Sequence, residues 1–189
     1  MNKIVVSSLA ILLSSTLMAN GVDNMAVKKE GIGYIKMLGM TLKSELKAKM
    51  KADKSGMGAL GFCSAKAEQI TKDVNAKLPS YAKVRRTSLK LRNPNNKADE
   101  VDIKVMNEYV SAIENSTFTP KDIKVVKVGD TTRVYKPLTI KPVCLKCHGS
   151  NLAKNISEAI KASYPNDKAI GYKDGELRGV VVAEIKEKR

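Results

Sequence analysis

Apolar residues recur at helical spacing through the first half of the chain. An amphipathic helix is expected over about residues 33–51, where lysines fill the face opposite Ile35, Leu38, Leu42, Leu46 and Met50. A second helical stripe runs over about residues 57–77 and is ended by a Leu-Pro pair; it consists of Leu60, Cys63, Ala67, Ile70 and Val74. A third helix is expected over 98–114, with Val101, Val105 and Tyr109 on one face.

The second half of the chain changes to patterns that are typical of strands. Residues 82–90 are extended, 123–128 and 132–140 form two strands of a hairpin around Gly129-Asp130, and 179–185 form a final strand. A short helix is expected over 157–164. Helices followed mainly by sequential strands predict an α+β domain with an antiparallel sheet and an N-terminal helical segment. We expect a single domain over 33–189, preceded by an irregular segment over 20–32.

The first 19 residues resemble an export signal. Lys3 is a short basic region, residues 4–17 are apolar apart from serines and a threonine, and Ala19 offers the small residue that a signal peptidase needs. The apolar run is too short for a comfortable transmembrane helix. We therefore expect cleavage after Ala19 and a periplasmic location without an integral membrane span, with an uncleaved membrane anchor as the alternative.

Cys144-Leu145-Lys146-Cys147-His148 gives the pattern C-x-x-C-H, which is the attachment motif of a c-type haem. Two thiols at this spacing can form thioethers with the two vinyl groups of one porphyrin. The adjacent His148 imidazole is then positioned as the proximal iron ligand. The motif therefore predicts one covalently bound haem c. Two alternatives are a redox disulfide and a zinc site to which Cys63 would contribute a ligand. A disulfide site would not need His148, and adjacent Cys147 and His148 would be awkward as two ligands of one zinc ion.

Composition narrows the possible partners. The formal net charge is +15, but the lysines are scattered and not interleaved with aromatic residues, so nucleic acid is not an expected partner. The positive charge suits haem propionates, an acidic redox partner or an anionic membrane surface. The chain has three cysteines, and if two carry haem, Cys63 is left over, which excludes a disulfide framework.

His148 is the sole histidine of the chain, so a second histidine cannot occupy the other face of the iron. The alternatives are Cys63 as a thiolate or a methionine, and Met57 is the leading methionine because it lies near Cys63 in the sequence; the other candidates are Met25, Met37, Met40, Met50 and Met106. Cys63 could equally be a small buried hydrophobic residue. A thiolate would favour ferric iron and a low reduction potential, whereas methionine would raise the potential.

Several further segments resemble the periplasmic c-type haem sensor domains with a PAS-like fold, a family long catalogued as a domain of unknown function. The matching segments, in order, are Cys63 within a helix, Arg86-Thr87-Ser88, Arg92-Asn93-Pro94-Asn95, Tyr135-Lys136-Pro137, Cys144 to Gly149, Tyr164-Pro165-Asn166-Asp167, Ala169-Ile170-Gly171-Tyr172, and Gly175 to Gly179. The resemblance covers roughly residues 33–185. It implies a PAS-like fold with a central antiparallel sheet flanked by helices. It also implies a haem bonded through Cys144 and Cys147, with His148 and the distal Cys63 on the iron.

These observations together predict an exported mono-haem protein that senses redox state or a small gas such as CO or NO, with Cys63 released from the iron on reduction. A periplasmic electron-transfer cytochrome is the alternative, and a haem enzyme is less favoured because no second histidine is available as an acid–base group. Partners would be a redox or signalling protein in the periplasm. Arg85, Arg86 and Arg92 could pair with the propionates, since a guanidinium matches a carboxylate; otherwise they are solvated.

Overall fold

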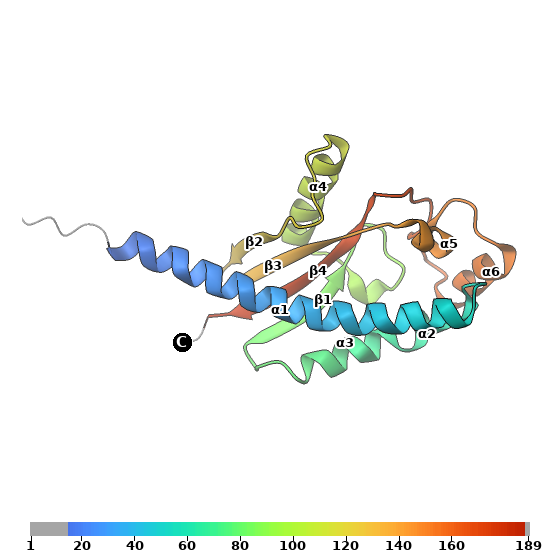
Figure 1. Cartoon of the computed structure of the whole chain (residues 1–189), viewed down its shortest axis with the longest axis horizontal. Coiled ribbons are helices and arrows are strands. Elements are labelled where there is room, and N and C mark those ends of the chain that lie inside the picture. The colour runs from blue at the N-terminus through green and yellow to red at the C-terminus, as the bar shows by residue number, and fades with distance from the viewer. Residues whose placement is uncertain (1–14, 188–189) are drawn as a thin grey trace, which may run out of the picture.

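A four-stranded antiparallel sheet forms the centre of the molecule (Figure 1). The computed structural model describes residues 15–187, and side chains from residue 24. The sheet order is β1-β4-β3-β2, and the strands are β1 (Ala82–Thr87), β2 (Lys124–Val128), β3 (Thr131–Thr139) and β4 (Leu177–Lys186). β4 lies between β1 and β3, and its five consecutive residues 179–183 are all buried. This explains the unbroken apolar run over residues 179–183 in the middle of the strand.

One face of the sheet is covered by α1 (Ser15–Ala52) and α3 (Ala67–Asn75). Ile35 and Leu38 of α1 pack against Val84, Val134 and Val181 of three neighbouring strands. α1 approaches the sheet closely at Gly31, where an added Cβ would lie 2.6 Å from Val134 Cγ2. A residue without a side chain is therefore required there.

The other face of the sheet is covered by α4 (Glu100–Glu114). Its start is fixed by a capping box in which Asp99 and Asp102 each accept a hydrogen bond from the other's backbone N–H. Val105, Met106 and Tyr109 pack against the apolar side chains of β3 and β4. The Asp102 carboxylate is fully buried here and pairs with Arg85 of β1.

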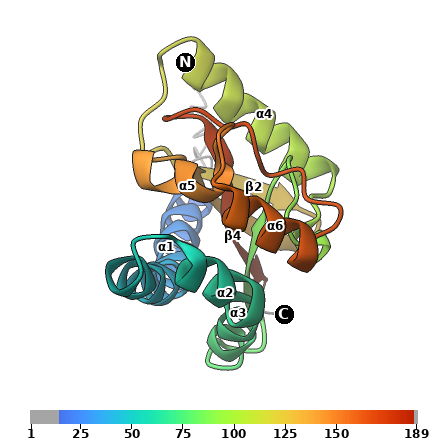
Figure 2. The same cartoon turned by 90° about the vertical axis from the view of Figure 1, so that its right-hand side faces the viewer.

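The remaining short elements gather at one end of the sheet (Figure 2). They are α2 (Met57–Ala65), α5 (Leu145–His148) and α6 (Lys154–Ser163), with two single 3-10 turns, η1 (Pro94–Asn96) and η2 (Pro142–Cys144). α2 packs against α6, and α5 lies beside both α6 and η2. The C-x-x-C-H motif lies in this group of elements, outside the strands.

The structure confirms the α+β, PAS-like fold with an antiparallel sheet and an N-terminal helix. Two local expectations are wrong. Residues 20–32 are helical, because α1 extends through them and packs on the sheet, with Gly31 close to Val134 and Ile32 against the same apolar cluster. The helix expected over 57–77 is divided at Lys66, where the backbone φ of −118° separates α2 from α3.

The predicted export signal lies largely outside the described residues. Of positions 1–19, the structure describes residues 15–19, as the first turn of α1, and cleavage after Ala19 stays a prediction. Within residues 15–187, no helix is both long enough and apolar enough to cross a membrane.

Candidate haem-attachment site

The motif Cys144 to His148 forms one compact turn of helix. Pro142 starts a 3-10 turn in which the Cys144 N–H donates to Lys141 O at 2.8 Å, and α5 follows directly. The two thiols are free and partly buried. Cys144 packs beside Ile140, Ala169 and Tyr172, whereas Cys147 packs beside Leu60, Ile156 and Ile160. The two sulfurs therefore belong to separate apolar clusters.

The His148 ring is oriented by a backbone carbonyl. Its Nδ1 lies 2.7 Å from Ala169 O, and because a carbonyl only accepts, Nδ1 carries the proton. The Tyr172 ring packs edge-on, with centroids 6.2 Å apart. Burial, and then the charges of Arg178 and Arg92, lower the pKa of His148 to about 3. The imidazole is therefore neutral near pH 7, with an unprotonated Nε2, and this is the form that binds a metal.

Cys63 lies on α2, where burial raises the pKa of its thiol, and the nearby Cys147 thiol contributes to this rise. Arg86, Arg92 and Arg178 act in the opposite direction. The Tyr164 hydroxyl donates to the Cys63 carbonyl at 3.3 Å. Cys63 is partly buried and does not point fully into the core; the buried residues of α2 are Ala59, Leu60 and Phe62.

Two of the three predicted arginines lie at this end of the sheet. Arg92 donates to the backbone carbonyl of Cys147 at 2.7 Å and pairs with Asp167 at 2.9 Å. Arg86 lies near Cys63, donates to Ala67 O at 3.3 Å, and has a buried Nε without a hydrogen-bond partner in the described part of the chain. Arg86 is thus the arginine of this pair with an open N–H.

Arg85 is placed differently, and its expected propionate contact is not supported. Successive residues of a strand point to opposite faces, so Arg85 points toward α4 and away from Arg86. It forms a bidentate pair with the buried Asp102 carboxylate, at 2.8 and 2.9 Å, and also bonds Glu184. Because these carboxylates already occupy its guanidinium, Arg85 has a structural role on the α4 face.

Three residues of the site were not singled out from the sequence. Asp167 fixes Arg92, Ala169 supplies the carbonyl that orients His148, and Arg178 donates to Ser88 Oγ at 2.6 Å while it packs over the Tyr172 ring. Every residue has a backbone carbonyl, so the sequence does not show which one accepts the His148 hydrogen bond. The one available signal was that all three lie in the segments that carry the family resemblance.

The candidate methionines are not equivalent in the structure. Met57 begins α2, six residues before Cys63, and is about one-third exposed at 36%. Met106 is fully buried in the cluster under α4, on the far face of the sheet from α1. Met25, Met37 and Met40 are exposed on α1. Met57 therefore remains the methionine rival to Cys63.

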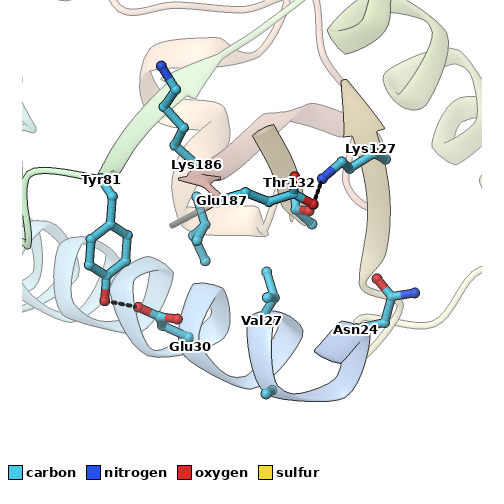
Figure 3. A pocket seen from close by; sticks show the side chains of 10 residues that line it. Asn24, Val27, Glu30, Tyr81, Lys127, Thr132, Lys186 and Glu187 are labelled. Atoms are coloured by element: carbon cyan, nitrogen blue, oxygen red, sulfur yellow. Dashed lines mark hydrogen bonds and ion pairs between the residues drawn. The ribbon is translucent and has the colours of Figure 1, made fainter. Parts of the chain in front are cut away.

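A cavity of about 770 Å³ lies elsewhere, between α1 and the strand ends (Figure 3). The Tyr81 hydroxyl donates a hydrogen bond to the Glu30 carboxylate there, and Lys127 forms an ion pair with Glu187. The predicted site residues do not line it. Among residues 15–187, no cluster of three or more His, Cys, Asp or Glu side chains is arranged to hold a metal ion by itself.

Comparison with known proteins agrees with this fold. A search of curated proteins gives no match. A solved structure, described as the crystal structure of the cyanobacterial heme-protein Tll0287, superposes with a TM-score of 0.59 at 21% sequence identity, covering 93% of this chain and 99% of the other. The sequence matches the Tll0287-like family over residues 12–185, which confirms the resemblance drawn from its motifs. The chain therefore belongs to the Tll0287-like family.

Proposed function

We propose that this protein binds one haem c covalently through Cys144 and Cys147, with His148 Nε2 as the proximal ligand of the iron. The observation that carries the proposal is the His148–Ala169 hydrogen bond of 2.7 Å directly after the two cysteines. Metal-binding histidines generally donate their other ring N–H to such an acceptor. The haem protein Tll0287 of the same fold supports the choice of cofactor.

The residues of the site fit this group chemically. When bound, the haem supplies an iron that exchanges one electron. Cys144 and Cys147 hold the porphyrin edge, and Ala169 keeps the imidazole in the tautomer that binds iron. Arg86 Nε, buried and without a partner among the described residues, is suited to a propionate carboxylate, because an unsatisfied buried donor is costly.

We infer that Cys63 is the distal ligand and that the protein is a sensor. Arg86, Arg92 and Arg178 place positive charge around its sulfur, which favours a thiolate. An electron delivered to a bound iron by a redox partner would remove one positive charge, and Cys63 would then be held less strongly as a thiolate. Burial raises the pKa of the free thiol, so a released Cys63 takes up a proton and does not rebind readily. The vacated position would then be open to CO or NO.

The proposed location is the periplasm, following removal of residues 1–19, because haem is attached to c-type proteins outside the bacterial cytoplasmic membrane. A partner there would be a redox or signalling protein. The second candidate function is an electron carrier between periplasmic proteins. The basic composition, with a net charge of +15, favours docking to an acidic redox protein.

Reductive titration under CO separates a sensor from a carrier. The haem-loaded protein is reduced anaerobically with and without CO, and its optical spectrum is followed. A sensor forms a CO complex as soon as the iron is ferrous, and Met57→Leu, the matched control on α2, behaves like the wild type. A ferrous protein that keeps both axial ligands and does not bind CO contradicts the sensor function and supports the carrier.

A further inference from the structure

Arg92 is joined to both backbone segments that hold His148. Its Nη2 donates to Cys147 O at 2.7 Å, in the residue before His148, and also contacts Ala169 O at 3.2 Å and Asp167 Oδ2 at 2.9 Å. Because Nη2 carries two hydrogens, one of its N–H groups is shared between two of these three acceptors. The same Ala169 oxygen accepts the His148 Nδ1–H at 2.7 Å. Arg92 and His148 therefore share one acceptor, which is possible because a carbonyl oxygen has two lone pairs.

Asp167 completes this arrangement. Its carboxylate accepts from Arg92 Nε at 3.2 Å and Nη2 at 2.9 Å, and also from the Ala169 N–H at 2.9 Å. Both side chains are nearly buried, at 9% exposure for Arg92 and 7% for Asp167. Arg92 thus contacts Ala169 at its carbonyl, and Asp167 contacts the same residue at its N–H. The pair also places a positive and a negative charge near the imidazole.

These contacts affect how much charge the His148 imidazole would donate to a bound iron, and so affect the reduction potential. A second donor on the Ala169 oxygen weakens it as an acceptor for the His148 Nδ1–H, so the imidazole gains less anionic character and donates less charge. The guanidinium charge also favours the reduced iron, because reduction lowers the local positive charge. Both effects raise the reduction potential, while the Asp167 carboxylate acts in the opposite direction.

We propose that Arg92 and Asp167 are positioning residues for the proximal ligand, and that their opposed charges shift the reduction potential of the haem site in opposite directions. This inference rests on the proposed function, in that it requires His148 on the iron. It assigns Arg92 to the proximal ligand, in place of the propionate contact expected from the sequence. It does not depend on whether Cys63 or another group is the distal ligand.

The test is potentiometric titration of haem-loaded Arg92→Gln and Asp167→Asn. The two variants break the same ion pair, yet Arg92→Gln should lower the potential and Asp167→Asn should raise it. We expect the equilibrium constant for reduction to change about tenfold in each direction, which is about 59 mV for one electron. Arg85→Gln, which breaks a buried pair on the α4 face, is the matched control and should leave the potential unchanged.

A structural role alone predicts shifts of the same sign, or no shift, for both variants, and either result overturns the proposal. Where Arg92→Gln does not fold, Asp167→Asn carries the test, and an unchanged or lower potential refutes it. The axial ligands are read in the same samples by EPR of the ferric form. If the wild type gives no EPR signal of a histidine-bound iron, the proposed function itself has failed.

Discussion

Gly149, directly after His148, is the position where a single methyl group should disturb the haem-attachment turn most. Its N–H donates to Leu145 O at 2.9 Å and closes α5. A Cβ at this position would lie 2.7 Å from the same backbone oxygen and 3.3 Å from Leu145 Cβ. The backbone φ of −75° suits alanine, so this contact is the source of the strain. The motif therefore needs glycine because of crowding.

Gly149→Ala should destabilise the protein by about 1–3 kcal/mol, the range for overpacking a well-packed site. For a chain of this length, that corresponds to a melting temperature lower by roughly 2–12 °C. The haem content should fall as well, since the shift displaces His148 relative to Cys144 and Cys147. Circular dichroism measures the first effect. The haem-to-protein absorbance ratio after co-expression with the haem-attachment machinery measures the second.

Gly33→Ala is the matched control, because an added Cβ at Gly33 meets no atom within 4 Å and its site is the interior of α1. It should stabilise the protein by about 0.5–1 kcal/mol through helix propensity and leave the haem content unchanged. If Gly149→Ala matches the wild type in both melting temperature and haem content, the close approach to Leu145 O does not constrain the motif.

Three further changes test other parts of the structure. Asp102→Asn leaves Arg85 without its buried counter-charge and should lower the free energy of unfolding in urea by about 3–5 kcal/mol. Lys154→Ala, in an exposed ion pair, should change the free energy of unfolding by less than about 1 kcal/mol. Equal effects of the two substitutions would contradict the stabilising role of the buried pair. Gly31→Ala should lower stability by about 1–3 kcal/mol, since its Cβ would meet the buried Val134, and a melting temperature equal to that of Gly39→Ala would refute this contact. In a haem-free Cys144→Ala, Cys147→Ala variant, Cys63 should react with iodoacetamide at pH 8 more slowly when folded than in urea, because burial raises its pKa; equal rates would show an accessible thiol.

Hydrophobic periodicity was sufficient to predict the α+β class, the strands and the helix α4. The apolar run of β4 and the hairpin at Gly129-Asp130 are local patterns, and local patterns can be read from a sequence. The extension of α1 through residues 20–32 could not be predicted in this way, because the close approach of Gly31 to Val134 of β3 joins residues far apart in the sequence.

The candidate site could be predicted where residue types and their spacing indicate the chemistry, as for Cys144, Cys147 and His148. Cys63 could be proposed because a single histidine leaves one face of the iron without an imidazole. The arginines required the structure, since Arg85 and Arg86 are adjacent in sequence yet lie on opposite faces of the sheet. The carbonyl of Ala169 could not have been found from residue types at all.

The central claim is that His148 and Cys63 hold the iron of one haem bonded to Cys144 and Cys147. The most direct measurement is the EPR spectrum of the haem-loaded ferric protein beside Cys63→Ala, with Met57→Leu as the control variant. We predict a low-spin signal typical of a thiolate ligand in the wild type and in Met57→Leu, and its loss in Cys63→Ala. A spectrum that Cys63→Ala leaves unchanged would remove Cys63 from the iron and contradict this account.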